Sequence, residues 1–125
     1  MEDGNPYNQE VRALFSALVH AGDIKGDYPQ VVVVETQESE QGARLVLSAG
    51  VKQWKIAEIR FRAWGCPHLL AGAEVFCSAM EGVPVNAFSH FGVVDLIERL
   101  DVPVQKTGRM LLIEDAARKL AAAME

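Results

Sequence analysis

The feature of this sequence that most restricts its fold is a change of hydrophobic period at Cys66. Over residues 54–64 apolar and polar side chains alternate, which is the pattern of a β-strand with two different faces. From Cys66 onward apolar residues recur about every 3.6 positions, which predicts a helix ending near Glu81, and Pro67 suits its first turn because a missing N–H costs nothing there. The strand would point Ala57, Ile59, Phe61 and Ala63 to one face and Glu58, Arg60, Arg62 and Trp64 to the other.

Two more strands are predicted before this one. Val31–Val34 is β-branched throughout and too short for a globular helix. Glu38–Gly42 is polar and contains glycine, so it predicts a hairpin turn into a second strand over Ala43–Ala49. After a further turn at residues 50–53, the third strand completes an antiparallel meander with one buried face and one wet face.

Helical patterns flank the predicted meander. The first, from Tyr7 to His20, has apolar residues at helical spacing and ends before two glycines. The region from Phe88 to Pro103 and the segment Gly108–Met124 show the same period. The order helix, three strands, three helices predicts an α+β fold, a three-stranded antiparallel sheet with helices packed on one face. The chain has 125 residues, half of them apolar, so we expect a single domain over residues 1–125.

Charge and composition disfavour several classes of function. A net charge of −5 argues against nucleic-acid binding, which depends on clustered lysine and arginine. No apolar run approaches the ~20 residues of a membrane-spanning helix, so no membrane association is expected. The acidic start Met1–Gly4 is unlike a secretory signal, and we expect a cytoplasmic location. The sequence has no Gly-rich phosphate loop, no His-Glu-x-x-His pair and no plausible serine triad, so we do not expect an enzyme.

The two cysteines, Cys66 and Cys77, are predicted to be free thiols. They lie eleven positions apart in one predicted helix, which separates them by about 16 Å at the helical rise per residue. A disulfide needs Cα atoms within about 7 Å, so neither can bridge the other, as is usual in a reducing compartment. Cys77 lies among apolar residues of a helix that should pack on the sheet, and we expect a buried, inert thiol there.

Three segments resemble one known family. Residues 55–66 read KIAEIRFRAWGC and resemble the third strand and Phe-Gly-Cys turn of the NifU/IscU-type iron–sulfur cluster assembly scaffold family (NifU N-terminal-like domain), in which a cysteine starts a helix. Residues 113–120 read IEDAARKL and are similar to the family's C-terminal Ala-Glu-Asp-Ala helix. Residues 7–11 read YNQEV and are similar to its opening helix. The segments keep the family's order and span nearly the whole chain, which implies a role in iron–sulfur cluster assembly.

The resemblance also identifies where this chain departs from the family. Members of the family that this chain resembles hold a nascent cluster with three cysteines and an aspartate, because soft thiolate ligands bind iron well. Cys66 corresponds to one of these cysteines. Ser39 and Gln41 stand at the first cysteine and the aspartate, and a rival register over residues 21–23 supplies no thiol either. Arg109 stands at the third cysteine, where a guanidinium cannot ligate a metal cation. The resemblance therefore implies a divergent member with lost ligand positions at Ser39, Gln41 and Arg109.

Cys66 and its neighbours allow two interpretations. At a helix N-terminus the dipole and free N–H groups favour a thiolate, and Arg109 would stabilise that thiolate if the fold brings it near. Cys66 would then be a sulfur acceptor or a single cluster ligand, with His68 as a second metal ligand. Alternatively, Cys66 is a small hydrophobic residue that caps the helix, and His68 is simply solvated.

Other candidate residues have more ordinary interpretations. Glu38 and Glu40 would offer oxygen ligands near the lost first cysteine, but a charged hairpin tip is usually a solvated turn. The histidines outside the Cys66 region have no spacing that favours a site. Surface or packing roles are therefore expected for His20 and His90, and packing roles are expected for Trp54 and Trp64.

We therefore expect an iron–sulfur cluster assembly protein with a divergent scaffold-like domain. Cluster iron ordinarily takes four thiolates, so iron or a cluster would bind only transiently, with further ligands from a second subunit in a homodimer or from small thiols. The expected partners are a cysteine desulfurase or other assembly proteins. An Hsp70-type chaperone is not expected, because the family's Leu-Pro-Pro-Val-Lys segment is altered to DVPVQ at residues 101–105.

Two alternatives to this hypothesis remain open. A fold can outlive its site, so the chain could be an interaction or regulatory protein of the assembly machinery with no cluster or metal of its own. The other alternative is a thiol-redox module built on Cys66, which the lack of a resolving cysteine within reach disfavours.

Overall fold

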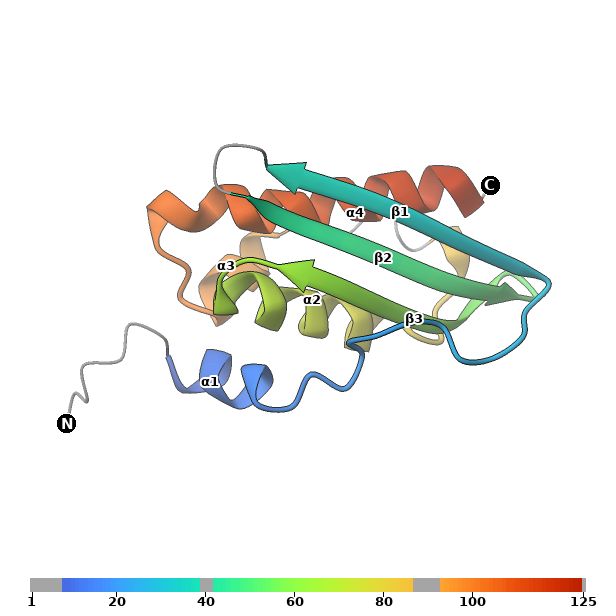
Figure 1. Cartoon of the computed structure of the whole chain (residues 1–125), viewed down its shortest axis with the longest axis horizontal. Helices are drawn as coiled ribbons and strands as arrows, with labels where there is room; N and C mark the ends of the chain where they lie inside the picture. The colour runs from blue at the N-terminus through green and yellow to red at the C-terminus, as the bar shows by residue number, and fades with distance from the viewer. Residues whose placement is uncertain (1–7, 39–41, 87–92, 125) are drawn as a thin grey trace.

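The computed structural model describes residues 8–38, 42–86 and 93–124, which form an α+β fold (Figure 1). The order of the elements is the predicted one: a helix, three strands and then helices. The strands are β1 (Gln30–Glu38), β2 (Ala43–Lys52) and β3 (Lys55–Trp64). The helices are α1 (Gln9–Phe15), α2 (Pro67–Met80), α3 (Val94–Arg99) and α4 (Thr107–Met124), with a 3₁₀ turn, η2 (Val104–Lys106), before α4.

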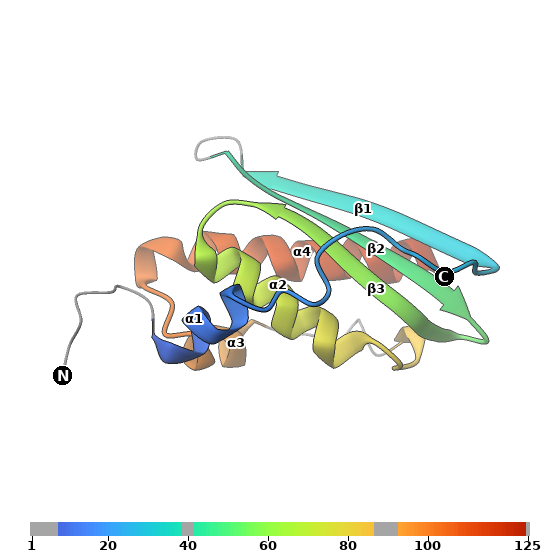
Figure 2. The same ribbon diagram turned by 60° about the horizontal axis from the view of Figure 1, so that its bottom comes forward.

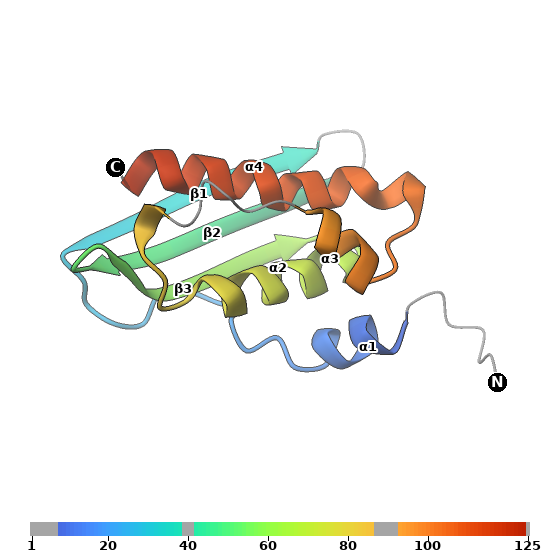
Figure 3. The same ribbon diagram turned by 180° about the vertical axis from the view of Figure 1, so that it is seen from behind.

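The three strands form an antiparallel sheet in the order β1-β2-β3. Its outer face bears no helix in the described ranges, as Figures 1 and 2 show. Its inner face is covered by two helices (Figure 3): α4 lies against β1 and β2, and α2 lies against β3. Helix α1 packs on α2. The predicted fold class, a small antiparallel sheet with helices on one face, is confirmed.

The hydrophobic core lies between the inner face of the sheet and helices α2 and α4. Gly72 in α2 lets these two helices approach closely, because a Cβ atom there would lie 2.8 Å from Cδ1 of Ile113 in α4. Each large apolar side chain fully withdrawn from water contributes about 1.5–3 kcal/mol, so this layer is the main source of stability. The largest fully buried side chains are Leu45, Leu47, Ile56, Ile59, Phe61, Leu69, Phe76, Leu100, Met110, Ile113 and Leu120.

A β-bulge near the start of β3 makes the predicted alternation wrong for Ala57. Gly50 of β2 pairs with Glu58, but the next residue of β2, Val51, pairs with Ile56, so Ala57 is an extra residue in β3. A shift of one residue exchanges the two faces of a strand. Ile56 is therefore buried and Ala57 is exposed, whereas the alternation predicted Ala57 to face inward.

The two tryptophans also lie differently from the prediction. Trp54, expected to pack, is 74% exposed, because it sits in the two-residue turn beyond the last pair of β2 and β3. Both turn residues, Gln53 and Trp54, have positive φ angles of 54° and 65°, as a type I′ turn requires. Trp64, at the other end of β3, is exposed as well, and the guanidinium carbon of Arg44 lies 4.6 Å from its ring centroid.

The first helix is shorter than predicted. It ends at Phe15 rather than His20, and Tyr7 lies outside the described residues. Beyond it, the chain runs beside β3: the N–H of Phe61 donates to the carbonyl of His20 at 2.9 Å, and the N–H of Gly22 donates to the carbonyl of Phe61 at 2.8 Å. These bonds pair both backbone groups of Phe61 at the free edge of β3, which a helix extending through His20 could not do.

The later helices are close to their predicted positions. Helix α4 begins at Thr107, one residue before the predicted start at Gly108. Helix α3 covers Val94–Arg99, which is the latter part of the predicted region. Phe88, His90 and Phe91 lie outside the described residues. None of the helices in the described ranges combines the length and the apolar character needed to cross a membrane.

Candidate functional site

Four chain segments meet at one end of the sheet: the end of β1, the start of β2, the link from β3 to α2, and the start of α4 (Figure 1). Glu38, the last residue of β1, pairs with Ala43 in β2. The Cβ atom of Ala43 lies 3.7 Å from the place that a Cβ on Gly65 would take. On the other side, Oε2 of Glu38 lies 3.1 Å from the place of a Cβ on Gly108. We call this region the β1–α4 end.

The residues that gather at the β1–α4 end immediately precede the predicted site positions. Gly65 precedes Cys66, and Gly108 precedes Arg109. The topology thus brings Cys66 and Arg109, 43 positions apart in the sequence, to the same end of the molecule. Ser39, Glu40 and Gln41 follow Glu38 in the chain and lie outside the described residues.

Cys66 is the N-cap residue of α2. Its backbone is extended, with φ −81° and ψ 163°, and its side chain makes no capping hydrogen bond. Its carbonyl accepts from the N–H groups of Leu69 at 3.0 Å and Leu70 at 3.3 Å. The residue is partly exposed and packs against the edge of the core. The thiol therefore lies at the end of a helix where free N–H groups and the helix dipole stabilise negative charge.

His68 is buried, with 1% of its surface exposed, so the interpretation of a simply solvated side chain is wrong. Its pKa lies below the ordinary value of a histidine, mainly because burial penalises the charged ring. The positive charges of Lys106 and Arg109 lower the pKa further, and Asp101 opposes them. The neutral imidazole is therefore the favoured form at this end of α2.

Arg109 lies in the first turn of α4 and is half-buried. Its charge acts on His68, two residues beyond Cys66, which agrees with the convergence of the two segments. Together with Lys106 it brings positive charge to the β1–α4 end, where the carboxylate of Glu38 also lies. Stabilisation of a Cys66 thiolate by Arg109 stays a prediction, as does metal binding by Cys66 and His68. In the described part of the chain, no three His, Cys, Asp or Glu side chains are grouped so that they could hold a metal ion.

A shallow groove of about 370 Å³ runs along β3 on the side of the α1–β1 connection. The N–H of Leu70, one of its lining residues, donates to the carbonyl of Cys66, so the groove passes one helical turn from the cysteine. The lining is mostly apolar. It consists of Leu18, Ala21, Gly22, Phe61, Arg62, Ala63, Trp64 and Leu70.

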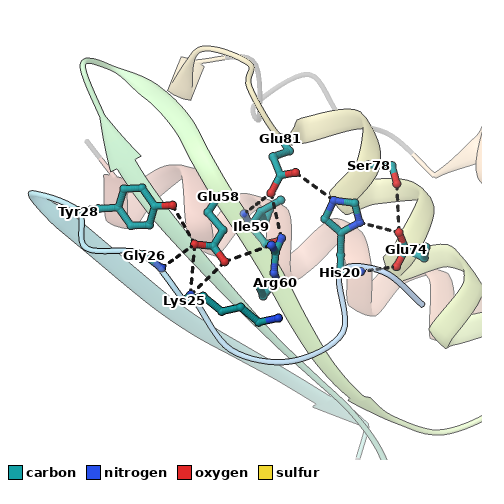
Figure 4. A network of polar contacts seen from close by, with 10 residues as sticks. All are labelled: His20, Lys25, Gly26, Tyr28, Glu58, Ile59, Arg60, Glu74, Ser78 and Glu81. Atoms are coloured by element: carbon teal, nitrogen blue, oxygen red, sulfur yellow. Dashed lines mark hydrogen bonds and ion pairs between the residues drawn. The ribbon is translucent and has the colours of Figure 1, made fainter. Parts of the chain in front are cut away.

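The wall of this groove is held by a polar network that sequence analysis missed (Figure 4). The ring of His20 contacts two carboxylates, one within α2 and one at the residue that caps its C-terminus. Nδ1 lies 2.6 Å from Oε2 of Glu74, and Nε2 lies 3.2 Å from Oε1 of Glu81. The backbone N–H of His20 also donates to Oε1 of Glu74 at 2.9 Å. Glu74 is almost fully buried. A glutamate between apolar residues of a helix was the available signal, because a buried carboxylate needs partners.

The network continues across the outer face of β3 to Glu58, which is 5% exposed. Its carboxylate accepts hydrogen bonds from the N–H groups of Lys25 and Gly26, each at 3.0 Å, and from the hydroxyl of Tyr28 at 2.8 Å. Burial raises the pKa of Glu58, but the hydrogen bonds from Gly26, Tyr28 and Lys25 outweigh it, and the pKa lies below the ordinary value. Residues 20–28 are thus fastened to β3 and α2 through charged groups.

Cys77 is fully buried beneath the network, as predicted. Burial is the main cause that raises the pKa of its thiol, and the charges of Glu74 and Glu81 add to this effect. The neutral thiol is therefore strongly favoured, which makes Cys77 a packing residue.

Comparison with known proteins places these features in a family. A family model described as the NifU-like N-terminal domain matches residues 6–124, nearly the whole chain. The chain belongs to this NifU-like family. The match confirms the resemblance inferred from residues 55–66 and 113–120. A comparison with curated proteins finds no match for this NifU-like chain.

Solved structures with a similar fold come from several sources. One is described as a candidate iron–sulfur cluster assembly scaffold protein for the SUF system, from the thermophile Fervidobacterium islandicum AW-1. It matches with a TM-score of 0.71 and 16% identity, and the match covers 92% of the NifU-like chain and 96% of the other. Another is the N-terminal part of a nitrogen-fixing NifU-like protein from Brucella abortus, with a TM-score of 0.62, 10% identity and coverage of 90% and 92%. A hypothetical protein matches with a TM-score of 0.57, 17% identity and coverage of 86% and 96%. At these identities the likeness shows the shared fold.

Proposed function

We propose that this NifU-like chain takes part in iron–sulfur cluster assembly through the single thiol of Cys66, which accepts sulfur or serves as one ligand of a cluster in transit. The observation that carries the proposal is the place of Cys66: a partly exposed N-cap residue, at the end of the molecule where Lys106 and Arg109 supply positive charge. A partly exposed thiol in this position is open to a partner that delivers sulfur or a cluster.

The sulfur-acceptor role requires a simple exchange of bonds. The thiolate of Cys66 attacks the outer sulfur of a persulfide carried by a cysteine desulfurase. A new S–S bond forms at Cys66, the S–S bond to the desulfurase cysteine breaks, and that cysteine leaves as a thiolate. The proton of the persulfide stays on the transferred sulfur. Because one S–S bond replaces another, the exchange involves no net oxidation or reduction.

Stable cluster binding by one chain is not part of this proposal. Cluster iron ordinarily takes four thiolates, and the described residues include one partly exposed cysteine and no group of three metal-binding side chains. Iron or a cluster would be cargo, held with ligands from a partner or from small thiols. The chain would act by carrying and binding rather than as an enzyme.

The proposed partners are a cysteine desulfurase or other assembly proteins. An Hsp70-type chaperone is not among them, because the altered segment at residues 101–105 keeps only half of the family's recognition sequence. We also propose a cytoplasmic location. The two free thiols, Cys66 and Cys77, are consistent with a reducing compartment.

The experiment that tests the acceptor role is sulfur transfer from a cysteine desulfurase supplied with cysteine, followed by intact-mass and peptide analysis. The wild type and Cys77→Ala should gain one sulfur atom at residue 66, and Cys66→Ser should gain none. Cys77→Ala is the matched control, since it removes the other thiol and leaves the β1–α4 end unchanged. Labelling that persists in Cys66→Ser, or that is absent from the wild type, would refute the acceptor role.

A second candidate function is that of an interaction protein of the assembly machinery without a cluster of its own. The observation that favours it is the arginine at position 109, where the family places a cysteine. Capture of the desulfurase by both the wild type and Cys66→Ser, together with no visible absorbance after anaerobic reconstitution with iron and sulfide, would support this function. Absorbance that is present in the wild type and lost in Cys66→Ser would exclude it.

A further inference from the structure

Strand β1 has an unusually open edge. It is nine residues long, and it pairs with β2 without interruption from Gln30 with Val51 to Glu38 with Ala43. On its other side no strand pairs with it in the described ranges, and Figures 1 and 2 show it at the margin of the sheet. The strand contains no proline and no bulge, two devices that commonly protect such an edge.

The hydrogen bonds of β3 reveal which backbone groups of β1 point outward. Both backbone groups of Phe61 bond to residues 20–22 and so point away from β2. In an antiparallel sheet, each pair of opposite residues is either hydrogen-bonded or non-hydrogen-bonded, and the two types alternate along the strands. Phe61 and Leu47 form a non-hydrogen-bonded pair, since the backbone groups of Phe61 point away from β2. Leu47, opposite Phe61, therefore points its N–H and C=O toward β1, where it meets Val34. It follows that the neighbours of Val34, namely Val33 and Glu35, direct their backbone groups outward.

An independent contact supports this assignment. The carbonyl of Glu35 accepts a hydrogen bond from Nζ of Lys119 in α4 at 2.9 Å, so it is not committed to β2. Lys119 thereby occupies one outward carbonyl in the second half of the edge. In the described part of the chain no other residue bonds to the outward backbone groups of Val31 and Val33, which face outward by the same alternation, and their side chains on the outer face are 50% and 61% exposed.

We propose that this edge pairs with the β1 strand of a second copy of the chain, antiparallel and centred on the stretch Val31–Val33. The two sheets would then form one six-stranded sheet. The charge pattern favours the same strand as partner, because Glu35 and Glu38 lie in the second half of β1 and the first half is uncharged. When Val31 faces Val33 of the second copy, Glu35 falls opposite Pro29 and Glu38 lies beyond the start of that copy's β1, whereas in-register parallel pairing would place like charges side by side. A two-fold arrangement pairs the β1 edge of one copy with the β1 edge of the other, so neither β1 edge is left to add a third copy.

This dimer differs from one that shares a cluster between two Cys66 thiols. Cys66 follows β3, at the opposite margin of the sheet from β1. Two copies joined through β1 would separate their β3 strands by five strand spacings, about 24 Å. Each β1–α4 end would remain open to its own partner. The inference therefore does not depend on the proposed role of Cys66, and either can fail without the other.

The experiment compares oligomeric state in wild type and two variants by sedimentation equilibrium across a wide concentration range. The wild type should approach twice the chain mass of 13.7 kDa. Val33→Pro removes an outward N–H and leaves the hydrogen bonds to β2 in place, so it should be monomeric. Val33→Thr keeps the N–H and the β-branched shape, so it is the matched control and should remain dimeric. Circular dichroism should report the same secondary structure for all three.

Hydrogen exchange of the wild type supplies a measurement that needs no variant. The amides of Val31 and Val33 should exchange rapidly in dilute solution and become protected at the concentrations where the dimer forms. Three outcomes would overturn the proposal: a wild type that stays monomeric, as expected if the edge serves an extended peptide of another protein; a folded Val33→Pro that still dimerises; or amides of Val31 and Val33 that stay unprotected in the dimer. If Val33→Pro does not fold, the exchange data decide.

Discussion

Nδ1 of His20 lies 2.6 Å from Oε2 of Glu74, a carboxylate that is almost fully buried in α2. The other ring nitrogen faces Glu81 at 3.2 Å. A doubly protonated imidazole can donate to both carboxylates, whereas a neutral ring can donate to only one of them. Since residues 20–22 also bond to β3 through Phe61, the histidine fastens the connection between α1 and β1 to two elements at once.

The first prediction concerns this clamp. His20→Ala should lower the free energy of unfolding by about 1–3 kcal/mol, because Glu74 would remain buried with fewer donors. Urea unfolding measures the change. The matched test is a double-mutant cycle with Glu74→Gln, in which the two substitutions should couple by about 0.5–3 kcal/mol. Additive effects would show that the contact contributes nothing beyond the two residues taken separately.

The second prediction concerns the close crossing of α2 and α4. Gly72→Ala should destabilise the protein by about 1–3 kcal/mol, since the new Cβ would lie 2.8 Å from Cδ1 of Ile113 in a filled core. Alanine is the better helix former by about 1 kcal/mol, which offsets only part of this cost. Ile113→Val removes the opposing methyl group, so it should restore stability to Gly72→Ala while destabilising the wild type. Thermal unfolding of the four proteins checks this reversal of sign.

Local patterns were sufficient to predict the sheet and the start of α2. Alternation identified β3, a run of valines identified β1, and the proline after Cys66 identified the first turn of the helix, because each pattern reflects a constraint within a few residues. The placement of Cys66 as an N-cap residue follows from the same local information. The resemblance to a family added Arg109, which lies far away in the sequence.

Features that depend on distant contacts were missed. The bulge at Ala57 comes from the way β3 pairs with β2, and no residue of β3 requires it alone. His20 was assigned to a helix because its neighbours have helical spacing, yet its hydrogen bonds to Phe61 and Glu74 lie 41 and 54 positions away. A single sequence gives the pattern of each segment but not which segments will meet. Glu74 signalled only that some partner must exist.

The third prediction is loss of stability in acid. The pKa of Glu58 is lowered in the folded state, and so is that of Glu81, where hydrogen bonds from Ile59 and His20 outweigh the opposing effect of burial. Below the ordinary carboxyl value of 4.5 the unfolded chain therefore binds more protons, so the stabilisation present above that pH is lost as the pH falls through the folded-state pKa values.

The pKa of His68, also lowered, acts in the same direction but at higher pH: its contribution is present above about 6.5, the ordinary histidine value, and falls below it. The free energy of unfolding, measured from pH 7 to pH 3, should decline throughout. Glu58→Gln should show a lower stability at pH 7 and a shallower decline below pH 5. An equal slope in this variant would contradict the role given to Glu58.

The fourth prediction is unequal reactivity of the two thiols. Cys66 is partly exposed, whereas Cys77 is fully buried and burial raises the pKa of its thiol. Under native conditions iodoacetamide should modify Cys66 and leave Cys77 unmodified, and in denaturant both should react. Peptide mass spectrometry over time gives the two rates. Similar native rates would mean that the region around α2 opens far more readily than its burial implies.

The last prediction tests whether Arg109 supplies charge to the β1–α4 end. Because Arg109 lowers the pKa of His68, Arg109→Gln should raise that pKa toward the ordinary histidine value, as an NMR titration of the ring would report. If the same charge favours the Cys66 thiolate, the variant should also alkylate more slowly at neutral pH, and added salt should shrink the difference from wild type. Arg118→Gln is the matched control, since Arg118 is exposed on the same helix and paired with Glu114, and it should change neither quantity. A shift at His68 without a change at Cys66 would confine the influence of Arg109 to the imidazole and leave the thiol to the helix N-terminus alone.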